Sequence, residues 1–164
     1  MILKDKLIKE KIAELSSHYH LFYNNQFIKY YLLDAKISKN IWIDIECLMN
    51  SVNDFETSGC ELENLYEQIS SFVTFITVMQ NEVIPKMLNE ENLQSKKLSA
   101  TNKVLYKMTL NNLPENIRIL INMINELYNT LKGIDISMNG EDSALYSNLS
   151  YLKKIDDNLN SQSS

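Results

Sequence analysis

The stretch ELENLYEQISSFVTFITVMQNEV, residues 61–83, decides the fold of this chain. Its apolar residues recur at alternating steps of three and four, and they are Leu62, Leu65, Ile69, Phe72, Ile76, Met79 and Val83. This spacing places them on one face of an α-helix, and such a face must be buried along its length against partner helices. The stretch therefore predicts a long amphipathic helix inside a helical bundle.

Two further segments carry the same pattern of apolar residues. In residues 39–56 the pattern consists of Ile41, Ile45, Leu48, Val52 and Phe55. In residues 114–132 it consists of Ile117, Leu120, Ile124, Leu127 and Leu131. Three such faces can cover one another within one chain, so they do not require the chain to dimerise. We therefore predict an all-α fold, an elongated antiparallel helical bundle with coiled-coil-like seams.

The composition favours helices over sheets. The 164 residues include only three glycines and two prolines, whereas sandwiches, barrels and doubly wound sheets need many turn residues to reverse their strands. An apolar share of 45% and a charged share of 23% suit one domain with a modest core. We predict that residues 1–133 form the bundle, and that residues 134–164 form a C-terminal partner-binding segment with a disordered tail.

In the first half of the chain, residues 2–31 are predicted to form one amphipathic helix with Asn24 and Asn25 inside it. The next helix is expected to begin after Ser38, whose hydroxyl can accept a hydrogen bond from a free backbone N–H of the first turn. Gly59 is expected to end that helix, because glycine takes the left-handed conformation at a helix C-terminus most easily.

In the second half, Pro85 is expected to kink or stop the helix that contains the opening stretch, because proline lacks the backbone N–H and clashes with the preceding turn. A more exposed helix is predicted over residues 93–113. Pro114 is then expected to start a new helix, where its missing N–H costs nothing. Gly133 is expected to end this helix, and a turn-rich segment follows it.

The charge and the length of the apolar runs exclude several classes of protein. The net charge is −5, and Arg118 is the only arginine, so no guanidinium cluster can grip nucleic acid. No apolar run reaches the roughly 18–20 residues of a membrane span, and the N-terminus lacks the apolar block of a signal peptide. We therefore expect a soluble, cytoplasmic protein, with Cys47 and Cys60 as reduced thiols.

The residues that could carry chemistry do not form a site in the sequence. His18 and His20 are two residues apart, so on a helix they point to different sides and cannot share a metal ion without outside ligands. Glu90 and Glu91 lie in a polar stretch, whereas a general acid needs a pocket that raises its pKa. Motifs for phosphate binding or nucleophilic catalysis are absent from the sequence. We predict no enzymatic activity, no metal and no cofactor.

Two apolar surfaces have no assigned partner in this arrangement. One is the aromatic-rich end of the first helix, with Phe22, Phe27, Tyr30 and Tyr31, which suits either core packing or a protein interface. The other is a short last helix, which either packs back on the bundle or detaches and captures a partner helix. The apolar face of this last helix consists of Leu145, Leu149, Leu152, Ile155 and Leu159.

The run LYEQISSFVTFITVMQNEVIPKMLNEENLQSKKLSATNKVLYKMTLNNLPENIRILINMI resembles FlgN-type flagellar export chaperones in the order of its features. In that family a long amphipathic helix ends in an acidic-apolar step like Glu82 and Val83. A polar turn like residues 89–92 follows, and a lysine like Lys103 and an arginine like Arg118 come later. The resemblance covers residues 62–159.

The resemblance implies a small acidic helical protein of the cytoplasm without enzymatic activity. Such chaperones bind the C-terminal helical regions of hook-associated proteins of the FlgK and FlgL type, and they do so with their own C-terminal part. Carried onto this chain, the resemblance assigns partner binding to the Leu145–Leu159 face. The alternative hypothesis is a structural subunit of a stable homo- or hetero-oligomer, with residues 22–33 as a permanent interface.

Overall fold

The computed structural model describes residues 2–139. Two short strands, β1 (Ile2–Leu3) and β2 (Cys60–Glu61), accompany a series of helices. The helices are α1 (Lys6–Tyr23), α2 (Gln26–Asp34), α3 (Lys39–Ser58), α4 (Leu62–Val78), the π-helical turn η1 (Met79–Val83), α5 (Ile84–Asn89), α6 (Glu91–Lys97) and α7 (Ala100–Asn139). The predicted all-α fold is confirmed.

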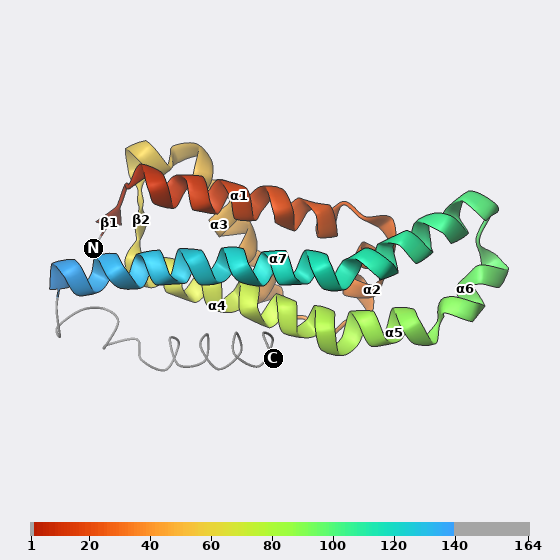
Figure 1. Cartoon of the computed structure of the whole chain (residues 1–164). Helices are drawn as coiled ribbons and strands as arrows, with labels where there is room; N and C mark the ends of the chain where they lie inside the picture. Colours follow the sequence, from red (N-terminus) through yellow and green to blue (C-terminus); the bar gives the residue numbers. More distant parts are fainter. Residues whose placement is uncertain (1, 140–164) are drawn as a thin grey trace.

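Four long helices form an up-down-up-down bundle. Helix α3 packs on α1 and on α4, and α7 packs on the same two helices from the other side. Figure 1 shows α1 and α4 running away from the end that carries β1 and β2, and α7 running back toward it. The strands pair antiparallel, with Ile2 opposite Glu61 and Leu3 opposite Cys60, so they hold the starts of α1 and α4 together.

The three predicted seams line the centre of the core. Each of the seven seam residues of the opening stretch is at most 1% exposed, and the five seam residues of α7 are fully buried. In α3, Ile45, Leu48 and Phe55 are buried, but Ile41 and Val52 are only partly buried. Helix α1 adds a buried face of its own, which consists of Ile8, Ile12, Leu15, Tyr19 and Phe22. Because each seam is covered by another within the chain, the bundle is closed without a second copy.

The first predicted helix is interrupted at Asn24 and Asn25, so the expectation of one continuous helix was wrong. Asn25 has an extended backbone with φ −77° and ψ 123°, and its side-chain Oδ1 accepts hydrogen bonds from the backbone N–H groups of Phe27 and Ile28 at 3.0 and 3.1 Å. An asparagine side chain can satisfy the free N–H groups of a new helix, and this competes with continuing the old one. Residue Asn25 therefore ends α1 and begins α2.

Ser38 and Gly59 have the predicted roles at the ends of α3. The Ser38 hydroxyl accepts a hydrogen bond from the backbone N–H of Asn40 at 3.2 Å. Gly59 follows the last residue of α3 with a φ of 69°. A Cβ atom at this glycine would lie 2.6 Å from the carbonyl oxygen of Leu3, so the position excludes larger residues. The turn after α3 can therefore approach β1 closely.

The chain stays helical through Pro85, but the turn before this proline is widened. The five residues before Ile84 form the π-helical turn, in which the Ile84 N–H bonds to the carbonyl oxygen of Met79, five residues earlier. Such a widened turn rearranges the backbone hydrogen bonds just ahead of a residue that cannot donate one. The chain then continues as α5, with Pro85 in its first turn.

Pro114 and Gly133 both lie inside α7, so the predicted helix boundaries at these residues were wrong. The helix runs without interruption for 40 residues, a length of about 60 Å. Leu113 and Ile117 on either side of Pro114 are fully buried, as are Leu131 and Asp135 around Gly133. Tertiary packing thus carries the helix across both residues, and Figure 1 shows α7 bent where it leaves the bundle.

The C-terminal prediction falls largely outside the described part of the chain. The boundary proposed at residue 133 lies within α7, which extends to Asn139. The apolar face from Leu145 to Leu159 lies outside the described residues. Among residues 2–139, no helix is long and apolar enough to cross a membrane.

Candidate functional site

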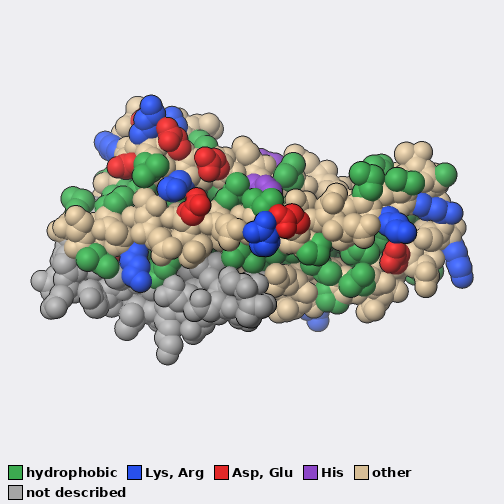
Figure 2. Space-filling view, viewed as in Figure 1, with side chains coloured by type: hydrophobic (Ala, Val, Ile, Leu, Met, Phe, Trp, Pro, Cys, Tyr) green, Lys and Arg blue, Asp and Glu red, His purple; other side chains and the backbone are tan. Residues whose placement is uncertain are grey.

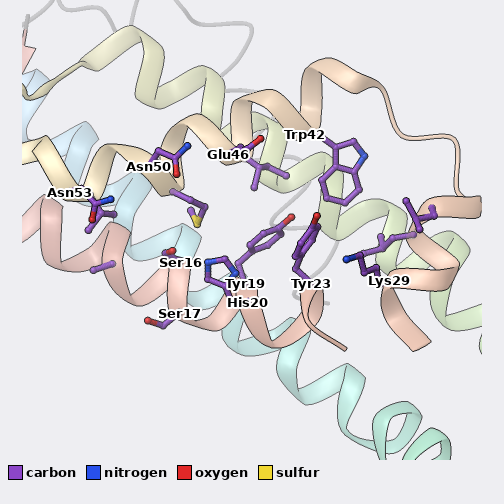
Figure 3. Close-up of a pocket in the computed structure, with 16 residues that line it drawn as sticks. Ser16, Ser17, Tyr19, His20, Tyr23, Lys29, Trp42, Glu46, Asn50 and Asn53 are labelled. Atoms are coloured by element: carbon purple, nitrogen blue, oxygen red, sulfur yellow. The ribbon is translucent and has the colours of Figure 1, made fainter. Parts of the chain in front are cut away.

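An open groove lies between α1, α2 and α3, on the side of the bundle away from α7. It has a volume of about 680 Å³. Figure 3 shows side chains from all three helices converging on it. The lining residues that it labels are Ser16, Ser17, Tyr19, His20 and Tyr23 of α1, Lys29 of α2, and Trp42, Glu46, Asn50 and Asn53 of α3.

The groove exists because small side chains of α1 face large ones of α3 without filling the space between the helices. Ala13, Ser16 and Ser17 recur at helical spacing and line the groove on the α1 side. On the α3 side, Trp42 and Met49 are only partly buried. The seam residues of α3 face the core, and the side chains of Trp42 and Met49 lie beside the seam on the same helix. They provide apolar surface at the mouth of the groove that the bundle does not cover.

An aromatic wall forms one part of the groove. The rings of Tyr19 and Tyr23 are stacked, with centroids 6.0 Å apart and planes 25° apart. The Trp42 ring meets Tyr23 at a centroid distance of 6.3 Å and an angle of 65°. Behind this wall, Phe75 of α4 makes edge contacts with Tyr19 at 5.3 Å and with Trp42 at 6.1 Å. The wall is thus held in place by the core.

Polar groups lie around this aromatic surface. The ammonium of Lys29 is 4.9 Å from the centroid of the Tyr23 ring, a cation–π contact between α2 and α1. Burial raises the pKa of Tyr19 far above its usual value, and the neighbouring Tyr23 and Glu46 raise it further. The Tyr19 hydroxyl is neutral at neutral pH, as tyrosine usually is, and a neutral hydroxyl can donate a hydrogen bond to a bound molecule. Apolar surface with a few polar groups is the usual make-up of a binding site.

The described residues do not assemble a catalytic or metal site here. Ser16, Ser17 and His20 all line the groove, but no hydrogen bond links them among residues 2–139. Within the same part of the chain, no three His, Cys, Asp or Glu side chains are grouped to hold a metal ion. The Nε2 atom of His18 instead forms a hydrogen bond with the backbone carbonyl oxygen of Asn116, at a distance of 2.9 Å. The chemistry that the groove offers is apolar burial combined with hydrogen bonding.

Two of the four aromatic residues predicted to bind a partner, Phe22 and Tyr31, are buried inside the bundle. Their side chains are 1% and 2% exposed. Phe22 packs edge-on against Phe75, and the Tyr31 hydroxyl lies 3.2 Å from the Tyr106 hydroxyl. Phe22 belongs to the buried face of α1, and the break at Asn25 turns α2 against the bundle, which buries Tyr31.

The other two predicted aromatic residues keep surface. Tyr30 is 62% exposed, and Phe27 is partly buried against the Tyr106 ring at a centroid distance of 5.2 Å. The five predicted residues from Leu145 to Leu159 lie outside the described part of the chain. Among the residues that the structure describes, the groove is lined by other side chains than these four aromatic residues.

Sequence reasoning missed the groove because Trp42 and Met49 extend the apolar stripe of α3 and read as additional core residues. The signal that could have found it lies in α1. Ala13, Ser16 and Ser17 sit three and four positions apart, next to the seam of Ile8, Ile12 and Leu15. Small residues beside a seam supply little side-chain volume, so the space in front of them is filled only if the facing helix comes close, and here α3 does not.

No family model, curated protein or solved structure matches this chain.

Proposed function

We propose that this protein is a non-enzymatic binding protein, a chaperone or adaptor that holds an apolar helical segment of a partner protein in the groove between α1, α2 and α3. The groove itself is the observation that carries the proposal. It is apolar and aromatic, it has neutral hydrogen-bonding groups, and its volume of about 680 Å³ lies in the range of roughly 300–1,000 Å³ found for binding pockets.

The mouth of the groove favours a protein segment over a small molecule. Leu33 lines it and is 77% exposed, and Tyr23 is exposed at the same mouth. A small molecule inside the groove would leave these side chains in water, whereas a helix lying along the groove would cover them. Each Leu or Ile that such a helix buries contributes roughly 1.5–3 kcal/mol before the cost of ordering is subtracted.

The resemblance to FlgN-type chaperones supplies a class of partner for the test. It suggests the C-terminal helical segment of a hook-associated protein, and a peptide of that segment from the same genome is the probe. Trp42 is the only tryptophan of the chain and lines the groove, so its fluorescence reports occupancy directly. We expect a saturable blue shift of Trp42 emission as the peptide is added, because the indole leaves water.

A pair of variants on one helix tests the location. Met49→Glu places a charge inside the groove and should weaken peptide binding by about tenfold or more, because the carboxylate must lose its water. Ile43→Glu is the matched control, since Ile43 is 45% exposed on α3 and does not line the groove. Equal losses in the two variants, or no blue shift with the wild type, would contradict the proposal.

A shortened chain separates this proposal from the assignment that the resemblance implies. A chain that ends at Asn139 keeps the groove and lacks the Leu145–Leu159 face. Unchanged peptide binding by this chain supports the groove. Loss of binding, with helical circular dichroism intact, would instead locate the partner on the C-terminal segment.

The second candidate function is a structural subunit of a stable oligomer. The exposed surface of Tyr30 and Leu33 on α2 favours it, because apolar side chains of this size are often covered in an obligate assembly. Size-exclusion chromatography with light scattering distinguishes the candidates. A dimer whose mass does not change on dilution supports the subunit, and a monomer that gains one peptide supports the chaperone.

A further inference from the structure

The bundle ends in an extension that is built from parts of three helices and has a composition of its own. Helices α5 and α6 and the first turns of α7 continue past the ends of α1 and α4, and Figure 1 shows them meeting in a narrow end. Helix α6 packs mainly on α5 and α7. The Tyr106 hydroxyl donates a hydrogen bond to the Met87 carbonyl oxygen at 2.8 Å and fixes α7 against α5. We call residues 91–108, from the start of α6 to Met108 of α7, the basic tip.

The basic tip is positively charged in an acidic protein. Residues 91–108 contain Lys96, Lys97, Lys103 and Lys107 and one acidic residue, Glu91. They contribute +3 to a net charge of −5, so the rest of the chain carries −8. Within the described part of the chain, none of these four lysines forms an ion pair. Their charge is therefore available to an anionic partner.

The same tip exposes large apolar side chains. Leu93 on α6 and Val104, Leu105 and Met108 on α7 are between 42% and 59% exposed. Val104 and Met108 are four positions apart, and Leu105 lies between them on the same face of α7. Figure 2 shows hydrophobic and Lys or Arg side chains together over this end of the molecule. Exposed apolar groups bordered by unpaired lysines are typical of an interaction surface.

We propose that the basic tip binds the surface of an anionic lipid bilayer, with its apolar side chains between the headgroups and its lysines against the lipid phosphates. The shape of the tip favours a bilayer over a protein helix. The hollow at the tip, between α6 and α7, measures only about 210 Å³, and a narrow end offers a partner helix no groove. Lysine stems can lie along apolar surface while their ammonium groups stay in water, which suits a membrane interface.

The charge arrangement also suits lipids. Lysine acts as a point charge and attracts a charged surface without fixed geometry, unlike the bidentate arginine fork that reads a carboxylate. The residues of the tip include no arginine. Each lysine close to an anionic membrane strengthens binding by roughly fivefold, so four lysines combine with the apolar contacts into a measurable affinity.

The test is sedimentation of the full chain with vesicles. Vesicles of phosphatidylcholine alone are compared with vesicles that contain about 30 mol% phosphatidylglycerol, at low and at raised salt. We expect binding to the anionic vesicles, little binding to the neutral ones, and release as the salt rises. Free phosphate at the same total concentration should not compete, because single phosphates lack the apolar layer that the tip enters.

Two variants and a control locate the surface. Lys96→Gln, Lys97→Gln, Lys103→Gln and Lys107→Gln together should weaken binding by about 100-fold or more. Replacement of Val104, Leu105 and Met108 by serine should weaken it by about tenfold or more, because the inserted side chains are lost. The control removes four exposed lysines elsewhere, with Lys4→Gln, Lys6→Gln, Lys36→Gln and Lys39→Gln, and should keep binding within about twofold. Circular dichroism verifies that each chain is folded.

Several results would overturn the inference. They are equal binding to neutral and anionic vesicles, no binding at low salt, and the same loss in the control as in the tip variant. Binding of an acidic amphipathic peptide to the tip without binding to vesicles would assign the surface to a protein and would also overturn it. The groove variant Met49→Glu should bind vesicles as the wild type does, so the two proposals fail independently.

Discussion

The side-chain amide of Asn25 donates a hydrogen bond to the Thr109 hydroxyl at 3.0 Å, across 84 positions of sequence. The Oδ1 of the same side chain accepts from the two N–H groups that begin α2. One residue therefore both starts α2 and attaches it to α7. Because α2 borders the groove through Lys29, Leu32 and Leu33, this attachment also positions one side of the candidate binding site.

Removing the Asn25 side chain should destabilise the fold. Asn25→Ala loses the helix cap and the bond to Thr109, so we expect the free energy of unfolding to fall by about 1–3 kcal/mol. Asn24→Ala is the matched control, because the Asn24 side chain is exposed and makes no hydrogen bond within the described part of the chain; it should cost less than about 0.5 kcal/mol. Urea unfolding of both variants measures the difference, and equal stabilities would contradict the role of Asn25.

The break at Asn25 shows why part of the fold could not be predicted. Ser38 and Gly59 were predicted correctly, because their effects depend on the backbone next to them. An asparagine inside an apolar pattern is compatible with a continuous helix and with a cap. Here the cap is accompanied by a bond to Thr109, a contact that no local pattern contains. The groove has the same origin, since its walls come from three helices whose arrangement follows from tertiary packing.

Pro114 and Gly133 show the opposite case. Here the local sequence indicates helix boundaries, but tertiary packing keeps the helix continuous. Proline and glycine usually mark helix boundaries, but their neighbours in α7 belong to the buried seam. Burial of a fully enclosed Leu or Ile contributes roughly 1.5–3 kcal/mol, which is comparable with the roughly 1 kcal/mol that glycine and the roughly 3 kcal/mol that proline cost inside a helix. Several such residues on one face therefore decide the outcome.

The two described glycines should respond to the same substitution with opposite signs. Gly59→Ala places a methyl group 2.6 Å from the Leu3 carbonyl oxygen at a positive φ, so we expect a loss of about 1–3 kcal/mol in unfolding free energy. Gly133→Ala meets no atom within 4 Å inside a helix and should stabilise by about 0.5–1 kcal/mol. Each variant is the control for the other in thermal unfolding. Changes of the same sign would contradict either the positive φ and close contact at Gly59 or the open helical position of Gly133.

Pro114 should be a site where stability can be gained. Pro114→Ala restores an N–H that can bond to the Leu110 carbonyl oxygen, and alanine can adopt the backbone angles of proline, so the bend of α7 need not change. After allowing for the stiffer unfolded chain that proline gives, we expect a gain of about 1–2 kcal/mol. Asn112→Ala, at an exposed position of the same helix, should gain only a few tenths of a kcal/mol. A loss of stability in Pro114→Ala would mean that proline itself holds the bend.

Alkaline pH should unfold the bundle through its buried tyrosines. Burial is the largest cause that raises the pKa values of Tyr19, Tyr31, Tyr66 and Tyr106 above the usual 10.0, and the charge of Asp135 raises that of Tyr66 further. Above about pH 10 the unfolded chain loses protons that the folded chain retains, so stability falls as the pH rises. The stability that the neutral buried hydroxyls contribute is fully present below about pH 10. Above that pH, each such hydroxyl lowers the free energy of unfolding by about 1.4 kcal/mol per pH unit.

Ultraviolet absorbance of tyrosinate, recorded together with helical circular dichroism, tests the tyrosine prediction. The four buried hydroxyls should ionise only as the helical signal is lost, because the folded bundle excludes the charged form. Tyr66→Phe removes one of these groups, so its stability should fall less steeply with pH than that of the wild type. Tyr30→Phe, at an exposed position, should leave the slope of stability against pH unchanged. Ionisation of all nine tyrosines with the helical signal intact would show that the buried hydroxyls are accessible to hydroxide in the folded state.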